Sequence, residues 1–446
     1  MNTFLFDQSI KGDNMVNRRS VLGSTLAAGT VGAGLLASLN QSAHAQQGKT
    51  VTVGSALPMS GFAAADGIEF KRGLEMAAEE INAAGGVLGQ MLEIKIEDTK
   101  EMGADIVTQA MQRLIDRHKA PVIINGYNLG TNMVEMDVAA DNDVMFLHYN
   151  TVLSHDNKFN SKPERYYSCF QGDPAEYWYG VGVLNFFKQL TESKKWAPTN
   201  KKLAIIASAG EYPITIANAI KTKAAEYGWE ISLFETVPFP TTQWGPTLAK
   251  LRQNPPAAIA ITHFLAQDLA QFMLQFSRQP TKSLIYMQYG PSLPPFREIG
   301  GASVNGVIYS TVVGCLPDAF SAAFRANYRK KYGPNAAFLT GSQTYDGLWH
   351  WALAAAIAGG ASEPGNKKGM QRVAAAMRRL IYRGVNGTCR YNPAGQSAYC
   401  YPTQTNDPSL GMPHQFLQHQ DFKTDARLIG PALYATNTFV MPPWIK

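Results

Sequence analysis

The stretch that decides the fold is residues 51–98, which read VTVGSALPMSGFAAADGIEFKRGLEMAAEEINAAGGVLGQMLEIKIED. Its first eight residues, 51–58, predict a buried strand. Apolar residues then recur at helical spacing from Phe70 to Ile81, and the glycine pair at 85–86 ends that helix. Apolar and charged residues alternate from 92 to 97 and predict a half-exposed strand. A strand, a helix and a second strand in this order indicate a parallel sheet covered by helices.

The same alternation continues along the chain. Further strands are expected at 121–125, 144–147, 203–207, 231–234, 257–262, 284–287 and 306–313, and helices at 106–115, 214–227, 266–277, 319–332 and 343–358. A chain of 446 residues is too long for one compact core. The sequence therefore predicts an α/β fold with two doubly wound parallel-sheet lobes and a hinge.

Composition and motifs exclude several classes of protein. Hydrophobic residues make up 45% and charged residues 17%, which is typical of a globular chain. The net charge of +6 is spread over short runs such as 329–331, which indicate a solvated surface rather than a nucleic-acid footprint. The sequence has no G-x-S-x-G, H-E-x-x-H, P-loop or Cys-x-x-Cys motif, and no third ligand accompanies His414 and His419. We therefore expect no enzyme activity, no cofactor and no metal site.

The N-terminal residues have the features of an export signal. Arg18 and Arg19 precede a weakly apolar run at 21–39, and Ala43-His44-Ala45 follows it. Residues 1–45 are interpreted as a signal peptide of the twin-arginine type, cleaved near Ala45, with either Met1 or Met15 as the start. Polar residues and glycines interrupt the apolar run, which argues against a membrane anchor. The mature protein is expected in the periplasm.

The cysteines were interpreted from that compartment. Cys389 and Cys400 flank an Asn-Pro-x-Gly turn at 392–395, so a hairpin in an oxidising space predicts a disulfide between them. Cys169 and Cys315 lie in apolar stretches and are expected to be buried thiols.

The candidate binding residues follow from the predicted sheets. In open α/β sheets, ligands bind beyond the carboxyl ends of the strands. Here those ends carry the loops 58–66, 125–131, 148–151, 208–213, 262–267 and 287–291. The loops are rich in Gly, Ser, Thr, Asn and Tyr, which offer neutral hydrogen-bond donors and aromatic walls. These groups suit a small polar or anionic solute better than a polymer.

The opening of the chain resembles the branched-chain amino-acid binding proteins, which are type I periplasmic binding proteins of ABC importers. The resemblance rests on residues 53–61, 73–89 and 97–98, with weaker matches at Tyr212, at 345–346 and in the hairpin at 387–395. It implies a two-lobed protein with three crossings, near Phe170, Gly306 and Arg383. The first lobe would comprise 46–169 plus 306–383, and the second 170–305 plus 384–446.

The resemblance also implies a ligand-binding set. In the first lobe, hydroxyls and backbone N–H groups would hold a ligand carboxylate, and Thr151 matches the threonine of the family. The implied set is Phe62, Asp66, Tyr127, Asn128, Gly130, Thr131, Tyr149, Asn150 and Thr151 from the first lobe, with Tyr212, His263, Gln288 and Tyr289 from the second. Asp66 has two interpretations, as a ligand anion or as a helix cap.

The second lobe departs from the family pattern. The loop at 262–265 lacks the expected tyrosine, and the loop at 288–291 lacks the carboxylate that pairs with a ligand ammonium. Because a buried ammonium needs a partner, we hypothesise a carboxylate without an amino group, such as an aromatic or keto acid. The expected partners are an inner-membrane ABC permease with its ATPase subunits, and the protein is expected to be a monomer. The alternative function is a ligand-sensing regulatory protein of the same fold.

Overall fold

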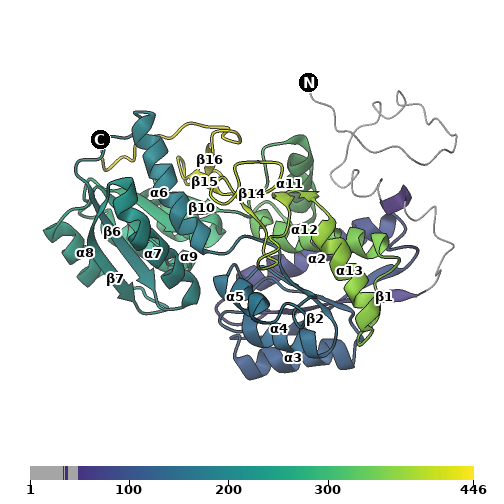
Figure 1. Ribbon diagram of the computed structural model, residues 1–446. Helices are drawn as coiled ribbons and strands as arrows, with labels where there is room; N and C mark the ends of the chain where they lie inside the picture. Colours follow the sequence, from purple (N-terminus) through teal and green to yellow (C-terminus); the bar gives the residue numbers. More distant parts are fainter. Residues whose placement is uncertain (1–33, 35, 39–48, 446) are drawn as a thin grey trace.

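The computed structural model describes residues 34, 36–38 and 49–445 (Figure 1). The arginine pair at 18–19 and the cleavage site at Ala45 lie outside the described residues. No helix in the described part of the chain is both long enough and apolar enough to cross a bilayer.

The first lobe is built on a five-stranded parallel sheet in the order β2-β1-β3-β4-β5. Its strands are β1 (Thr50–Leu57), β2 (Met91–Asp98), β3 (Val122–Ile124), β4 (Met145–His148) and β5 (Cys169–Gln171). Its helices are α2 (Ala64–Ala83), α3 (Ala104–Asp116), α4 (Asn132–Asp141), α5 (Leu153–Ser161), α11 (Ala319–Tyr332), α12 (Phe338–Ile357) and α13 (Lys367–Arg379).

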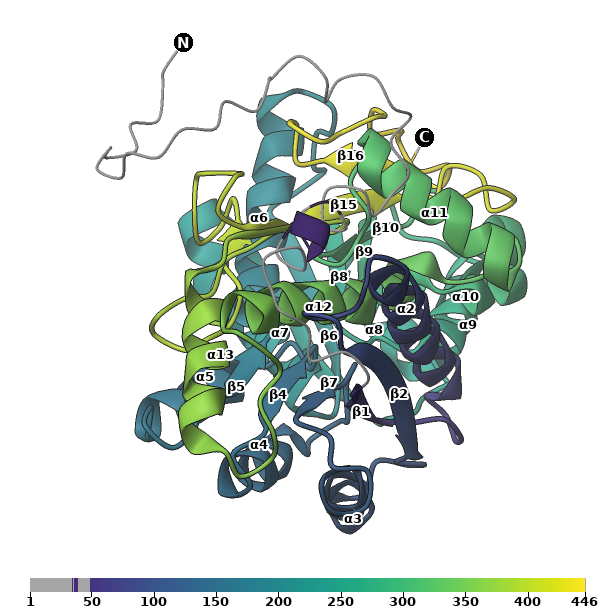
Figure 2. The same cartoon turned by 90° about the vertical axis from the view of Figure 1, so that its right-hand side faces the viewer.

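Side chains on the two faces of this sheet enter two separate cores. Val122 and Ile124 of β3 pack in the core that also holds Leu74 of α2 and Leu348 of α12. Ile123, between them, packs in the core with Leu114 of α3. Both faces are therefore covered, which explains why β3 is an uninterrupted apolar run and why β4 is apolar up to His148. Figure 2 shows α12 running between α13 and α2, and α12 contacts both of these helices.

The second lobe is built on a seven-stranded sheet in the order β16-β15-β10-β9-β8-β6-β7. Its strands are β6 (Lys202–Ser208), β7 (Glu230–Val237), β8 (Ala258–Ile261), β9 (Leu284–Gln288), β10 (Ile308–Thr311), β15 (Gln415–Gln418) and β16 (Arg427–Gly430). Its helical segments are α6 (Tyr177–Glu192), α7 (Glu211–Lys223), η1 (Ala224–Tyr227), α8 (Gly245–Gln253), α9 (Ala266–Phe276), η2 (Gly290–Ser292), α10 (Pro294–Gly300) and η3 (Gly301–Val304).

Successive side chains of a strand point to opposite faces, so those of the second sheet also enter two separate cores. Ile205 of β6 packs with Phe187 of α6, whereas Ile206 packs with Leu269 of α9 and Phe296 of α10. The five strands β7, β6, β8, β9 and β10 are parallel, and β15 and β16 add to the edge as antiparallel strands. The predicted α/β fold with two parallel-sheet lobes is confirmed, with this antiparallel edge as an addition.

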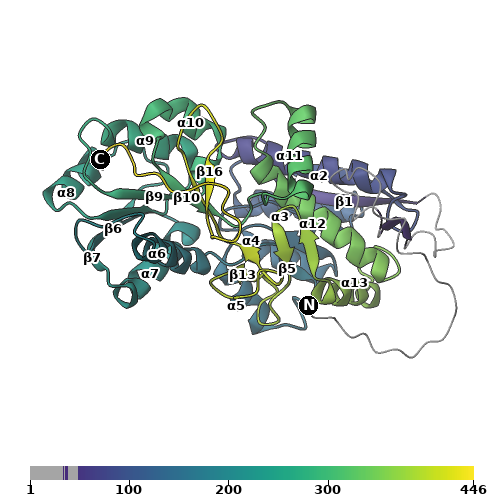
Figure 3. The ribbon, with the colours of Figure 1, turned by 90° about the horizontal axis from the view of Figure 1, so that it is seen from above.

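The crossings between lobes differ from the expected positions. The chain was expected to cross back to the first lobe near Gly306, before β10. Instead, β10 pairs with β9 in the second sheet, so the chain crosses back only after Thr311. Part of the chain beyond residue 384 also packs on the first lobe. The backbone N–H of Gln171, at the end of β5 in the first sheet, donates to the carbonyl oxygen of Gln396 at 3.0 Å. The chain joins the second sheet again at β15. Figure 3 shows the lobes side by side with this C-terminal segment at their junction.

The predicted disulfide is wrong, because Cys389 and Cys400 are both free, buried thiols. They lie in two different small ladders. Cys389 ends β12 (Gly387–Cys389), which pairs with β11 (Tyr382–Gly384), and Cys400 begins β13 (Cys400–Tyr401), which pairs with β14 (Met412–Pro413). The Cys389 thiol lies 3.9 Å from Gly172 O, whereas the Cys400 sulfur accepts a hydrogen bond from Thr403 at 3.0 Å. Cys169 and Cys315 are buried thiols, as predicted.

Candidate functional site

A cavity of about 50 Å³ lies between the carboxyl ends of the two sheets. It is lined by Tyr127, Leu129, Tyr149, Asn150, Thr151, Asp173, Tyr179, Tyr212, Phe264, Gln288, Tyr289, Thr311, Val313 and Gln343. Loops after β3, β4 and β5 supply one wall, and loops after β6, β8, β9 and β10 supply the other. The cavity therefore lies where the strand-end rule for open sheets places a ligand.

The structure brings seven of the expected residues into this cavity: Tyr127, Tyr149, Asn150, Thr151, Tyr212, Gln288 and Tyr289. They come from both lobes. On the second-lobe side, Gln288 Nε2 donates to Tyr212 Oη at 2.9 Å, which fixes the position of the tyrosine ring. The cavity is thus a closed interlobe cleft with neutral polar groups on both sides.

Asp66 does not line the cavity but joins the two lobes beside it. Its carboxylate accepts hydrogen bonds from Tyr127 at 2.5 Å, Tyr289 at 2.9 Å and Thr340 at 3.3 Å. Burial raises the pKa of Asp66, and the three hydroxyl donors partly offset that effect. The hydrogen bonds of its side chain go to these three hydroxyls, and Ala63 is the N-cap residue of α2, so Asp66 serves as a link between lobes and not as the cap. Because Tyr289 belongs to the second lobe, these bonds hold the cleft closed.

The other expected residues shape the walls or lie outside them. Phe62 is exposed and packs edge-on against Phe239 of the second lobe, with ring centroids 5.7 Å apart. His263 is buried, and its Nε2 pairs with Asp268 Oδ2 at 2.8 Å. Neither Phe62 nor His263 lines the cavity.

The loop between β3 and α4 is held together by its own polar side chains. Asn128 Nδ2 donates to Glu135 Oε1 at 2.7 Å, and Thr131 Oγ1 donates to Asn128 O at 3.1 Å. Gly130 is exposed and has a φ of 73°, which glycine adopts at no steric cost. These residues position Leu129 against the cavity but do not line it themselves.

Asp173 is the lining residue that changes the chemistry of the site, and the sequence interpretation missed it. It follows β5, so the strand-end rule could have found it. The loops expected at the strand ends did not include one after the apolar stretch that holds Cys169. Thr151 Oγ1 donates to Asp173 Oδ2 at 2.5 Å, and Asp173 Oδ1 is buried without a hydrogen-bond partner in the described part of the chain. Burial raises the pKa of Asp173 to about 8.

A second buried acceptor lies in the same wall. Gln343 Oε1, from α12, has no hydrogen-bond partner among residues 49–445. Other buried oxygens in the described residues also lack partners, but these two lie in the wall of the cavity, where a ligand can reach them. Asp173 and Gln343 therefore give the cleft two oxygens that can accept hydrogen bonds from a ligand.

Two lining residues have a positive φ although neither is glycine. Thr151 has a φ of 57° and Tyr289 a φ of 53°. A β-branched residue rarely adopts this conformation, because its Cβ approaches the backbone. Such strain persists where surrounding contacts hold it, as at ligand sites, and these two residues face the cavity from opposite lobes.

Aromatic rings supply most of the second wall. Tyr179 and Tyr212 meet edge to face with centroids 6.3 Å apart, and Tyr212 and Phe264 do so at 5.7 Å. Burial raises the pKa of Tyr179 and of Tyr212 well above its usual value. Their hydroxyls therefore keep their protons at neutral pH and can donate hydrogen bonds to an anionic group.

In the described part of the chain, no three His, Cys, Asp or Glu side chains are arranged to hold a metal ion. The chemistry of the cleft is that of hydrogen bonds, one carboxyl group and aromatic surface. Fold and site together define a two-lobed binding protein that encloses a small solute.

Comparisons with known proteins agree with that class. Residues 50–405 match the periplasmic binding protein family, and the chain belongs to this family of solute-binding proteins, which are not enzymes. A curated relative, Leu/Ile/Val-binding protein homolog 1 of Brucella abortus, is 24% identical over 352 residues, covering 77% of this chain and 87% of the relative.

Two solved structures illustrate the likeness. A protein of Silicibacter pomeroyi, described as a branched-chain amino acid ABC transporter, is 49% identical with a TM-score of 0.85, covering 89% of this chain and all of that one. The substrate-binding protein LivJ of Streptococcus pneumoniae, solved with isoleucine, is 18% identical with a TM-score of 0.68, covering 86% and 100%. The first likeness extends to sequence, whereas the second is one of fold.

Proposed function

We propose that the chain is the extracytoplasmic component of an ABC importer that captures a small α-amino acid between its lobes. The family match and the 49% identity to a protein described as a branched-chain amino acid ABC transporter support the importer role. The closed cleft between two lobes supports capture of a solute. Delivery to an inner-membrane permease with its ATPase subunits, a periplasmic location and a monomeric state are parts of the same proposal.

The observation that carries the amino-acid assignment is the pair of unpartnered oxygens on Asp173 and Gln343. An ammonium group has three donors, and a carboxylate is the partner that offsets the cost of burying its charge. The sequence hypothesis of a ligand without an amino group rested on the absence of such an acid. Because Asp173 lies in the cleft, that reason no longer holds, and we propose that the ligand carries an ammonium.

The carboxylate of the ligand is assigned to the hydroxyl donors. Tyr149, Tyr179 and Tyr212 line the cavity, and burial keeps all three protonated by raising their pKa values. Asp173 lies close enough to all three tyrosines to influence their pKa values. The cleft therefore offers hydroxyl donors for a carboxylate beside an acceptor for an ammonium, and this pairing matches a zwitterion.

The cavity measures about 50 Å³, whereas a cavity of about 150 Å³ holds benzene. Leucine has as many non-hydrogen atoms as benzoate, so either ligand would require the lobes to rest further apart, and the assignment rests on the polar groups of the cleft. Any solute enters only when the lobes separate, because Asp66 and Tyr289 hold the cleft closed.

A thermal-shift panel with purified mature protein tests the assignment. Leucine, isoleucine and valine are compared with their keto acids and with benzoate, since a ligand at 100 times its dissociation constant stabilises by about 2.7 kcal/mol. Asp173→Asn should remove the amino-acid shift, and the exposed Asp105→Asn should keep it. A shift produced by keto acids or benzoate but by no amino acid would overturn the ammonium assignment.

Uptake in the source bacterium separates import from sensing. Deleting the gene should lower the uptake of the radiolabelled ligand, and the intact gene should restore it. Unchanged uptake with altered transcription of other genes would instead favour the ligand-sensing alternative.

A further inference from the structure

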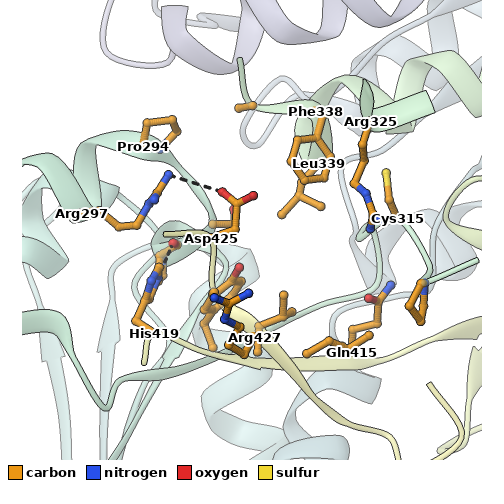
Figure 4. Close-up of a pocket in the computed structure, with 18 of the residues that line it drawn as sticks. Pro294, Arg297, Cys315, Arg325, Phe338, Leu339, Gln415, His419, Asp425 and Arg427 are labelled. Carbon is orange, nitrogen blue, oxygen red and sulfur yellow. Dashed lines mark hydrogen bonds and ion pairs between the residues drawn. The ribbon is translucent and has the colours of Figure 1, made fainter. Parts of the chain in front are cut away.

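A second and larger cavity lies at the junction of the lobes, outside the cleft, and measures about 360 Å³ (Figure 4). Its walls come from α10, β15 and β16 of the second lobe and from α11 of the first. The crossing segment after β10 separates the two cavities. Thr311 and Val313 line the cleft, whereas Cys315 and Pro317 line the second cavity.

The lining of this cavity is strongly cationic. It contains the four arginines Arg297, Arg325, Arg329 and Arg427, and Asp425 is its only acidic residue. Burial lowers the pKa of His419, the one histidine in the lining, to about 4, so that ring is neutral at pH 7. The side chains around the cavity therefore carry an excess of three positive charges.

Asp425 neutralises only part of this charge. Its carboxylate lies 2.8 Å from Arg329 Nη2 and 3.7 Å from Arg297 Nη2. The Arg329 pair joins the lobes, because α11 is anchored to the first lobe by a 2.6 Å hydrogen bond from Tyr328 to Glu69 of α2. Two arginines thus share one carboxylate at one end of the cavity.

The other two arginines have no acidic partner. Among the described residues, neither Arg325 nor Arg427 makes an ion pair, although both line the cavity. Figure 4 shows Arg325 reaching from α11 toward Cys315, with Arg427 on the opposite side near the strands. Neutral donors and acceptors, Asn335, Gln415, Thr436 and Asn437, complete the polar lining.

We propose that this cavity binds a small multivalent oxyanion, of the chemistry shared by polycarboxylates and phosphates. Guanidinium groups bind both kinds of anion through paired N–H donors. The volume lies in the range of small-molecule pockets. Since Arg325 belongs to the first lobe and Arg427 to the second sheet, a bound anion contacts both lobes and stabilises their observed arrangement.

Titration calorimetry with citrate and pyrophosphate tests the site, with sodium chloride holding the ionic strength constant. The wild-type protein should bind at least one of these probes with one-to-one stoichiometry. Arg325→Gln and Arg427→Gln should each raise the dissociation constant at least tenfold. Arg379→Gln, on the exposed face of α13, is the matched control and should leave it unchanged.

A variant that is expected to bind the anion more tightly tests the proposal independently. Asp425→Asn removes the single negative charge from the lining, so the same probe should bind severalfold more tightly. Each variant's melting temperature, measured without anion, shows whether it folds. The proposal is overturned if the wild type binds neither probe, if the control loses as much affinity as the cavity variants, or if Asp425→Asn leaves the affinity unchanged.

Discussion

Asp173 determines how ligand binding should depend on pH. In the closed cleft the pKa of its carboxyl group is about 8, because burial disfavours the charged form. A ligand ammonium favours the ionised form, so binding should release a proton below pH 8. The affinity for an amino acid should therefore rise between pH 6 and pH 8, by up to about tenfold per unit.

The affinity for the corresponding keto acid should depend on pH in the opposite direction. The keto acid has no ammonium, and the protonated Asp173 can donate a hydrogen bond to its carbonyl oxygen. Its affinity should therefore fall as pH rises over the same range. Calorimetry of both ligands at pH 6, 7 and 8 checks the two slopes, and parallel slopes would remove Asp173 from contact with the amino group.

The same carboxyl group should also affect stability. Its pKa in the folded state lies above the ordinary value of about 3.9 for an aspartate, so folded protein binds more protons than unfolded protein between about pH 4 and pH 8. Its contribution to stability thus falls as pH rises through that window. Asp173→Asn should raise the melting temperature of the empty protein at pH 8 and change it little at pH 4. Scanning calorimetry at the two pH values measures this, and an equal change at both would contradict it.

At the scale of elements, the pair α2 and α12 depends on two glycines. A Cβ on Gly73 would lie 2.0 Å from the Gly341 carbonyl oxygen and 2.5 Å from Thr344 Oγ1. Contacts this short force the helices apart. Gly73→Ala should therefore destabilise the protein by about 1–3 kcal/mol.

Gly245 of α8 is the matched control. A Cβ there meets nothing within 4 Å, so Gly245→Ala should be neutral or slightly stabilising. Urea unfolding of both variants measures the difference. Equal stability of the two would show that the α2–α12 contact adjusts without cost.

At the scale of the whole molecule, the hydroxyl of Tyr289 links the lobes. It contacts Asp66 at 2.9 Å and Thr340 at 3.0 Å. Tyr289→Phe removes these bonds and should weaken the closed state by about 0.5–1.5 kcal/mol, which lowers ligand affinity roughly 2- to 12-fold. Tyr332→Phe, which loses a bond within the first lobe only, is the control.

Small-angle scattering records the movement itself. The ligand should compact wild-type protein, and empty Tyr289→Phe protein should be more open than empty wild type. A variant as compact as wild type without ligand would show that other contacts hold the lobes.

The local sequence pattern was sufficient to predict the helices, the strands and the fold class. The stretch 51–98 yields β1, α2 and β2 within one or two residues at most boundaries, because apolar spacing and glycine stops are local signals. The seven expected residues that line the cavity lie in loops predicted at strand ends, and the family resemblance singled them out within those loops. The position of Tyr212 in its loop after β6 follows in the same way.

Only the tertiary structure decided which of these residues meet. Cys389 and Cys400 are close in sequence but enter different ladders, so proximity along the chain did not produce a bond. Asp66 became a link between lobes because Tyr289, 223 residues away, donates to it. Asp173 entered the cleft because β5 pairs at the edge of the first sheet. Contacts between distant segments depend on packing of the whole chain, which no short stretch of sequence specifies.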